Sequence, residues 1–268
     1  MVELDADNLY ELDRKSSKGN QMKFYRDGFW YKVDSLGYEG LAEYTVSRLL
    51  HYSTLDCDEF ADYDLEEIRY NGSVFRGCRS ADISGGWQMI TMERFFRAEY
   101  GFGANNVLYS PRDPEDRLAA FVDCVVRKTG ITEFGIYMNK MMTIDALFLN
   151  EDRHPNNIAL LTDGSSNYRL CPFFDHGAAL LSDTTLEYPL GREVFELEKR
   201  VKAKTFSGSF LEQLESSEKL FGKNIRFSYG YHEVEAILNS DVPYEEGVRR
   251  RVMDLIMDTR RKYDYLFC

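Results

Sequence analysis

Two short polar segments, DRHPNN at residues 152–157 and DHG at residues 175–177, enclose a pair of apolar runs. An Asp-Gly turn between these runs predicts a tight hairpin. The hairpin returns the chain on itself, so we expect Asp175 to lie close to Asn157. The long apolar segment 132–149 precedes the first polar segment and predicts a helix that is buried on most sides. The order of these pieces constrains the fold more than any other feature of the sequence.

The side chains of the two polar segments have the chemistry of a phosphoryl-transfer site. An amide oxygen from Asn157 and a carboxylate from Asp175 suit a hard cation such as Mg²⁺, which takes few protein ligands and leaves positions for phosphate oxygens. Asp152 is placed to accept a proton from a hydroxyl nucleophile. An aspartate, an asparagine five residues later and a metal-binding aspartate with a glycine two residues on follow the order found in kinases.

A second pair of residues indicates a binding site for nucleotide phosphates. Lys32 lies inside the aromatic strand FWYKV, where a lysine is costly unless it is paired. Glu43 follows in the next predicted helix, and Glu39 lies one turn earlier on the same face. The order of strand lysine and helix glutamate is that of kinases, and we favour Glu43 as the partner because it lies within the helix. The alternative is a lysine that reaches solvent from an edge strand.

The first third of the chain predicts short strands around a helix, and the remainder predicts mostly helices. Asp-Gly and Asn-Gly pairs mark two hairpins, and a helix is expected at 38–52 between them. This order predicts two unequal lobes. Together with the kinase-like order of the motifs, it leads us to expect an α+β, two-lobed protein-kinase-like fold with a small β-rich lobe at residues 1–84, a larger, mainly helical lobe at residues 85–268, and ATP between them. Helices of the larger lobe are expected at 87–100, 116–128 and 132–149, with more after residue 185.

The polar segment before the first strand reads KSSKGNQMK and lacks a GxGxxG motif. Gly19 between polar residues is nevertheless suited to expose backbone N–H groups to a phosphate. Ser16 and Ser17 lie just before it, and one interpretation is that the loop brings their hydroxyls to the transferred phosphoryl group, so that a phosphoserine there would add negative charge beside the nucleotide and repel it. The alternative is that they are ordinary solvated loop residues.

These motifs carry a resemblance to a known family. DRHPNN followed by FFDHG resembles the catalytic and metal segments of the HipA-like serine/threonine kinases, and is more distantly similar to those of phosphoinositide kinases. Gly19, Gln21 and Lys23 match the G-x-Q-x-K loop of HipA-like proteins, which the lipid kinases lack. The chain is shorter than full HipA kinases, so we expect it to lack their extra N-terminal subdomain, and it has Asp-His-Gly where lipid kinases have Asp-Phe-Gly.

The resemblance implies ATP and Mg²⁺ as cofactors, a protein substrate related to translation, and a helix-turn-helix antitoxin as partner. Three alternatives stay open: a lipid or small-molecule kinase with the same site, a catalytically silent kinase-shaped binding module, and transfer of AMP instead of phosphate.

Composition limits the partners and the compartment. The net charge of −12 argues against direct nucleic-acid binding, because such surfaces are usually basic. Five scattered cysteines without a CxxC pair suit reduced thiols in a cytoplasm better than disulfides or a zinc site. The N-terminus lacks the pattern of a signal peptide, and no apolar run approaches the roughly 20 residues that span a bilayer. We therefore expect a cytoplasmic protein without a membrane partner.

Overall fold

The computed structural model describes residues 1–10, 21–110, 112–240 and 242–268. Within them the chain divides into two compact units, each assembled from separate parts of the sequence. In unit 1, the β-rich N-terminal segment is grouped with helices from the end of the chain. Unit 1 comprises Met1–Asp82, Asp175–Arg200 and Phe227–Cys268, and unit 2 comprises Ile83–Phe174 and Val201–Arg226.

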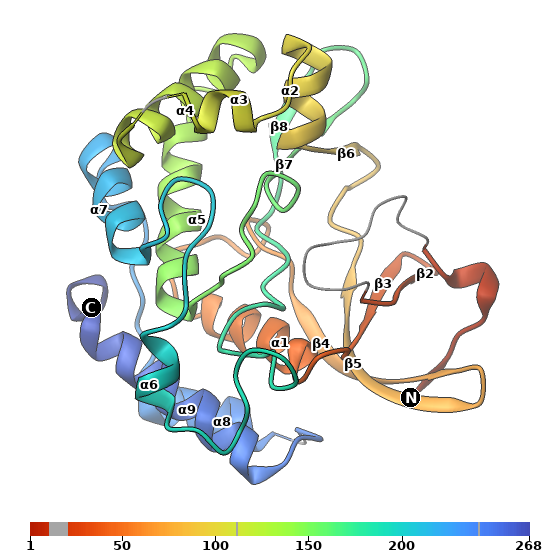
Figure 1. Cartoon of the computed structure of the whole chain (residues 1–268). Coiled ribbons are helices and arrows are strands. Elements are labelled where there is room, and N and C mark those ends of the chain that lie inside the picture. Colours follow the sequence, from red (N-terminus) through yellow and green to blue (C-terminus); the bar gives the residue numbers. More distant parts are fainter. Residues whose placement is uncertain (11–20, 111, 241) are drawn as a thin grey trace. The chain divides into compact units, whose positions relative to one another are not determined.

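Unit 1 contains a five-stranded sheet in the order β1-β4-β5-β3-β2 (Figure 1). Both predicted hairpins are present, and each turns through residues with positive φ: Asp27 and Gly28 in one, Asn71 and Gly72 in the other. This conformation is the one that Asp-Gly and Asn-Gly turns favour. The strands are β1 (Val2–Glu3), β2 (Lys23–Arg26), β3 (Phe29–Val33), β4 (Tyr63–Tyr70) and β5 (Ser73–Ala81).

Helix α1 (Glu39–Leu50) lies against strands β3, β4 and β5. Gly40 allows this close approach, because a Cβ atom there would lie 2.7 Å from the carbonyl carbon of Gly77 in β5. Gly77 acts within the sheet: a Cβ atom there would lie 2.0 Å from the carbonyl oxygen of Lys32 in the neighbouring strand β3. A side chain on Gly40 would push α1 away from the sheet, so this glycine sets the distance between them.

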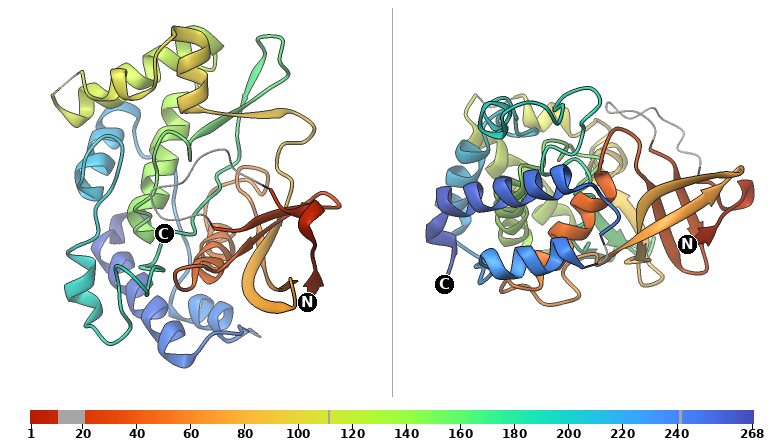
Figure 2. Two further views of the ribbon diagram at one scale, coloured as in Figure 1. Left: turned by 45° about the vertical axis from the view of Figure 1, so that its right-hand side comes forward. Right: turned by 90° about the horizontal axis from the view of Figure 1, so that it is seen from below.

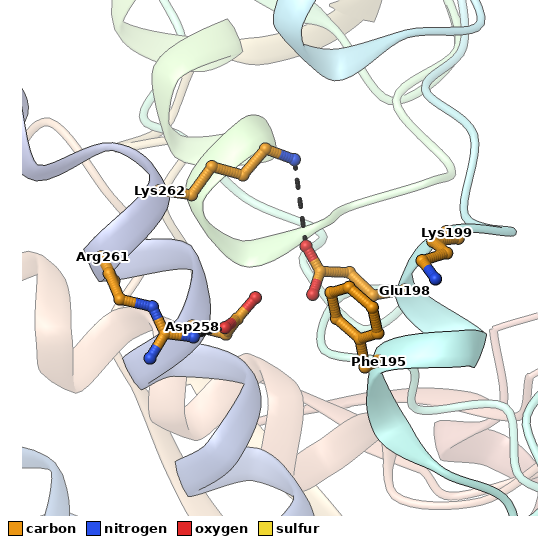
Figure 3. A pocket seen from close by; sticks show the side chains of 6 residues that line it. All are labelled: Phe195, Glu198, Lys199, Asp258, Arg261 and Lys262. Carbon is orange, nitrogen blue, oxygen red and sulfur yellow. Dashed lines mark hydrogen bonds and ion pairs between the residues drawn. The ribbon is translucent and has the colours of Figure 1, made fainter.

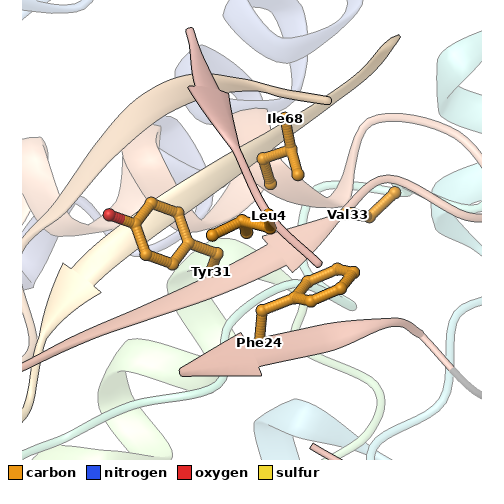
Figure 4. Packing of buried hydrophobic residues seen from close by; sticks show 5 residues of the cluster. All are labelled: Leu4, Phe24, Tyr31, Val33 and Ile68. Carbon is orange, nitrogen blue, oxygen red and sulfur yellow. The ribbon is translucent and has the colours of Figure 1, made fainter. Parts of the chain in front are cut away.

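The side chains of β3 alternate between the two faces of the sheet. Tyr31 and Val33 enter an apolar cluster with residues from three neighbouring strands and segments, whereas Lys32 faces α1. The sheet therefore has a dry apolar face and a face that carries a buried charge. The buried cluster consists of Leu4, Phe24, Tyr31, Val33 and Ile68 (Figure 4).

Three later helices complete unit 1: α6 (Val194–Glu198), α8 (Tyr231–Asn239) and α9 (Glu246–Lys262). Helix α8 packs against both α1 and α9 (Figure 2). The buried Arg251 of α9 donates to the carbonyl oxygens of Tyr188 (2.5 Å) and Pro189 (2.7 Å). This contact fastens the segment after the DHG motif to the last helix. A 3₁₀ helix at Ala6–Asn8 and another at Asp264–Leu266 lie near the two ends of the chain.

A surface cavity of about 340 Å³ lies between α6 and α9. Figure 3 shows Glu198 and Lys262 facing each other across it, with their charged atoms 3.9 Å apart. None of the residues that the sequence singles out for chemistry lines this cavity. Its lining is Phe195, Glu198, Lys199, Asp258, Arg261 and Lys262.

Unit 2 combines a three-stranded sheet, β6-β7-β8, with five helices in the part of the chain that is described. The expected helix at 87–100 is wrong in its first third, because Gln88–Thr91 pairs with β7 as a strand and the Thr91 side chain caps the helix by accepting from the Arg94 N–H. The elements are β6 (Gln88–Thr91), α2 (Met92–Tyr100), α3 (Asn105–Leu108), α4 (Pro114–Thr129), α5 (Phe134–Phe148), β7 (Ala159–Thr162), β8 (Tyr168–Leu170) and α7 (Phe210–Phe221).

Helix α5 is buried along most of its surface, as the sequence predicts. Its apolar side chains meet an aromatic core in which Phe121 of α4 contacts both Phe134 and Phe206, and Tyr137 stacks on Phe173 at 4.8 Å between ring centres. The helix ends at Phe148, and the next residue, Leu149, has a φ of 54° that turns the chain into the DRHPNN loop. Among the described residues, no helix has both the length and the apolar character that crossing a membrane requires.

Candidate functional site

Lys32 of β3 lies at the centre of a buried charged cluster in unit 1. Its ammonium donates to Glu43 Oε1, to Asp175 Oδ1 at 2.7 Å and to the Tyr63 hydroxyl at 3.4 Å. Lys32 is 7% exposed and Glu43 is fully buried. Because an isolated buried charge is very costly, these partners are what make a lysine at this position possible. The cluster brings together three residues that the sequence singles out: Lys32, Glu43 and Asp175.

The electrostatics of the cluster favour a charged lysine. Burial by itself lowers the pKa of the Lys32 ammonium, but the carboxylates of Asp175 and Glu43 outweigh burial, and the pKa lies well above its ordinary value. The lysine therefore carries its positive charge throughout the physiological pH range.

Glu43, and not Glu39, is the helix partner of Lys32. The second oxygen of Glu43 accepts from the backbone N–H of His176 at 2.8 Å, so one carboxylate ties the lysine strand to the DHG segment. Glu39 instead accepts from backbone N–H groups that precede α1, including those of Leu36 (2.6 Å) and Gly37 (3.1 Å). It therefore stabilises the start of the helix.

A second lysine approaches the same aspartate. Lys23 of β2 is paired in register with Lys32 of β3, and its ammonium lies 3.9 Å from Asp175 Oδ2. Two positive charges directly opposite each other on a sheet destabilise it. The Asp175 carboxylate, which contacts both ammonium groups, offsets this repulsion. Asp175 itself has a φ of 61°, a left-handed conformation that aspartate tolerates better than most residues and that is frequent at functional sites.

The loop that follows α5 places Asp152 and Asn157 in unit 2. The Asn157 amide nitrogen donates to the Asp152 carbonyl oxygen at 2.9 Å, which identifies the amide oxygen Oδ1 as the acceptor end of the side chain. The Asp152 carboxylate meets the Lys204 ammonium at 2.5 Å and the His154 ring nitrogen Nε2 at 3.6 Å. Asp152 and Asn157 are thus coupled through the backbone of a single loop.

A buried ion pair fixes the shape of this loop. Arg153 donates to the Asp145 carboxylate of α5, and to the carbonyl oxygens of Asn157 and Phe174, each at 2.8 Å. Burial raises the pKa of Asp145, and the Arg153 guanidinium and the Asn150 amide act against that rise. Phe174 directly precedes Asp175, so Arg153 holds both ends of the hairpin. The arginine orders the loop and is too buried to meet a substrate phosphate.

The remaining candidate residues have less defined surroundings. Gln21 is half-buried ahead of β2. Gly19, Ser16 and Ser17 lie outside the described residues.

The part of the chain that is described contains no cluster of three or more histidine, cysteine or acidic side chains arranged to hold a metal ion. Asn157 Oδ1 in unit 2 and the Asp175 carboxylate in unit 1 are each hard oxygen donors, the kind of ligand that Mg²⁺ prefers.

Sequence reasoning missed three residues that support the DRHPNN loop: Asp145, Lys204 and Thr205. Asp145 carried a usable signal, because an acidic residue inside the apolar helix sequence MMTIDALF is expensive without a partner. Lys204 and Thr205 carried none. They lie 52 residues from their partners Asp152 and Arg153, in a segment of ordinary loop composition.

No family model and no curated protein matches the sequence. Among solved structures, the chain is similar to the proinflammatory kinase CtkA of Helicobacter pylori, with a TM-score of 0.59 and 14% identity over 97% of this chain and 95% of that one. It is also similar to HipA in a toxin–antitoxin complex with HipB and operator DNA from Shewanella oneidensis MR-1. That likeness has a TM-score of 0.45 and 10% identity, and covers 95% of this chain and 62% of the other. The first likeness shows that this chain has the α+β, kinase-like fold that the sequence predicts.

Proposed function

We propose that this protein is an ATP- and Mg²⁺-dependent kinase, and specifically a HipA-like serine/threonine protein kinase. The observation that carries the proposal is the buried Lys32–Glu43 pair, which reaches both Asp175 and the backbone of His176. A fold needs no lysine at such a position, and an apolar residue there is generally no less stable. A kinase needs this pair to place a cation on the nucleotide phosphates. The kinase-like fold shared with CtkA supports the same conclusion.

Each candidate residue then has a chemical role. Lys32 and Lys23 neutralise phosphate charge, and Asn157 and Asp175 supply the oxygen ligands for Mg²⁺. When bound, the metal ion neutralises negative charge on the phosphate oxygens. Asp152 accepts the proton of the acceptor hydroxyl as the hydroxyl oxygen bonds to the γ-phosphorus, and the bond from that phosphorus to the β-phosphate oxygen breaks to release ADP.

The test is phosphate transfer from γ-labelled ATP by the purified chain with Mg²⁺. Asp175→Asn should abolish Mg²⁺-dependent transfer because it removes charge at the ion. Asp152→Asn should lower turnover by about two to four orders of magnitude while ATP still binds, because the base does not hold the nucleotide. Near-normal transfer by either variant contradicts the assignment, and a wild-type chain that binds ATP without transferring phosphate is a binding module.

The label also separates phosphate transfer from AMP transfer, since only an α-labelled nucleotide marks the product of the latter. Assays with protein extracts and with lipid vesicles as acceptors distinguish a protein kinase from a lipid kinase. Peptide mass spectrometry of the same reactions tests self-phosphorylation at Ser16 and Ser17, with Asp152→Asn as the inactive control. A translation-related substrate and a helix-turn-helix partner are further proposals, which follow from the resemblance to HipA-like kinases.

A further inference from the structure

Lys204, which is distant from Asp152 in the sequence, forms an ion pair with this proposed proton acceptor. The Lys204 ammonium is 2.5 Å from Asp152 Oδ1, and both residues belong to unit 2. The Asp152 side chain is 14% exposed and that of Lys204 is 37% exposed. The pair is therefore neither a core ion pair nor a freely solvated one, because its outer side is open to solvent and its inner side is held by the loop.

The loop at residues 201–206 is anchored on both sides of Lys204. Ala203 and Phe206 are buried, and the Phe206 N–H donates to Gln213 of α7 at 2.9 Å. The Phe206 carbonyl oxygen accepts from Arg117 of α4 at 2.9 Å. Lys204 therefore projects from a fixed backbone, and its approach to Asp152 is a built feature of the fold.

Thr205 shows strain at the same place. Its φ is 86°, a backbone conformation that β-branched residues rarely adopt because it is strained. Its hydroxyl donates to the carbonyl oxygen of Arg153, the residue next to Asp152. Two consecutive side chains, Lys204 and Thr205, thus hold two consecutive residues of the DRHPNN loop. Backbone strain that is retained beside a reactive group points to a functional constraint.

We propose that Lys204 is a catalytic residue that binds the transferred phosphoryl group, an inference that rests on the proposed kinase function. A general base contacts the attacking hydroxyl at about 2.6–3.2 Å, so the γ-phosphoryl group must lie within reach of a cation that touches the same carboxylate. A lysine ammonium has three N–H donors, and Asp152 takes one of them. Within the described residues the other two have no acceptor, so they are available to the oxygens of the phosphoryl group.

Lys204 does not exchange a proton in this step. The acceptor hydroxyl loses its proton to Asp152, its oxygen bonds to phosphorus, and ADP leaves with the electrons of the broken bond. Negative charge develops on the leaving oxygen as its bond to phosphorus breaks, while the charge of the transferring group is spread over its three equatorial oxygens. A fixed cation at this point stabilises the transition state more than bound ATP, which is the condition for a higher kcat.

Binding of a transition-state mimic tests the proposal without relying on turnover. ADP, Mg²⁺ and fluoroaluminate form a flat analogue of the transferring phosphoryl group, and calorimetry measures its affinity beside that of ADP with Mg²⁺ alone. Lys204→Met should weaken binding of the fluoroaluminate complex by about 100-fold and leave ADP affinity unchanged. Lys204→Arg should restore part of the loss because it keeps the charge.

The matched control is Lys202→Met, which removes an exposed lysine two residues earlier in the same loop. It should bind both complexes like the wild type. In transfer assays, Lys204→Met should lower kcat with an unchanged KM for ATP. Equal weakening of ADP and fluoroaluminate complexes, or wild-type affinity for both, overturns the role of Lys204. A wild-type chain that transfers no phosphate and does not prefer the fluoroaluminate complex refutes the proposed kinase function itself.

Discussion

At the scale of single residues, the buried pair of Lys32 and Glu43 allows a quantitative prediction about stability. Replacing Glu43 by Gln leaves the Lys32 charge in a buried site with one carboxylate fewer, and Lys32→Met leaves Glu43 without its cation. Each change should lower the free energy of unfolding by about 3–5 kcal/mol, as for other broken buried pairs. The double variant should lose clearly less than the sum, because it removes both charges. Urea unfolding of the four proteins measures these values.

The exposed pair of Lys219 and Glu115 provides the control for this cycle. Its charged atoms lie 2.6 Å apart, but the side chains are 71% and 34% exposed. Removing either member should cost no more than about 1 kcal/mol. Additive losses at Lys32 and Glu43 would show that the two charges do not depend on each other.

Asp34 should make stability depend on pH in an unusual direction. Burial raises its pKa to about 6, although hydrogen bonds from the Tyr244 hydroxyl and the Gly40 N–H act against the rise. In the unfolded chain the pKa is about 3.9, so the folded state binds the proton more tightly. The stability that this proton contributes is complete below about pH 4 and is lost as the pH rises through about 6.

Asp34→Asn removes the titrating carboxyl group, so the variant is the reference against which the wild type is compared at each pH. The free energy of unfolding of the wild type minus that of the variant should fall by about 2–3 kcal/mol between pH 4 and pH 7. Urea titrations at several pH values measure the difference, in which the other titrating groups cancel. A difference that does not change with pH would mean that Asp34 titrates normally in the folded protein.

At the scale of elements, the contact of α1 with β5 decides whether Glu43 reaches Lys32. Gly40→Ala should improve the intrinsic helix propensity of α1 by up to about 1 kcal/mol, yet the new Cβ would meet the backbone of Gly77. We expect a net loss of about 1–3 kcal/mol from overpacking, together with weaker binding of Mg²⁺-ATP. Thermal unfolding and nucleotide titration measure the two effects.

Gly247→Ala in α9 is the matched control. A Cβ atom at Gly247 would meet no other atom within 4 Å, and the φ of Gly247 is negative, so alanine fits there without strain. It should stabilise the protein slightly and leave nucleotide affinity unchanged. If Gly40→Ala behaves in the same way, the glycine does not set the position of the helix.

Local chemistry explains which elements the sequence predicts. Asp-Gly and Asn-Gly turns specify their hairpins through backbone conformation alone, so both were found. The strand at Gln88–Thr91 was missed because it exists through pairing with β7, some 70 residues later in the chain. The same limit applies to the site. Lys32 and Glu43 lie 11 residues apart and were paired from the sequence, whereas Lys204 meets Asp152 across 52 residues and left no local signal.

At the scale of the whole molecule, the path of the chain links the two units several times. The chain leaves unit 1 after Asp82, returns at Asp175, leaves again after Arg200 and returns at Phe227. The first return carries the DHG segment, and the last carries α8 and α9. Unit 1 therefore depends on segments that are synthesised long after its sheet, and folding of that sheet must wait for non-local contacts.

The last prediction follows from this path: a fragment of residues 1–82 should not fold by itself. In the full chain the buried Tyr38 hydroxyl donates to the Leu180 carbonyl oxygen at 2.6 Å, and Asp34 accepts from Tyr244. Glu43 loses its bond from His176 in the fragment, and one face of α1 loses α8. The fragment would thus expose a charged, formerly buried surface. We expect amide NMR spectra of the fragment without chemical-shift dispersion, and no cooperative thermal transition. Adding the separate fragment 175–268 should restore little order, because its two unit 1 segments are joined by residues 201–226, which belong to unit 2. A fragment 1–82 that unfolds cooperatively would show instead that the sheet and α1 form an independent folding unit.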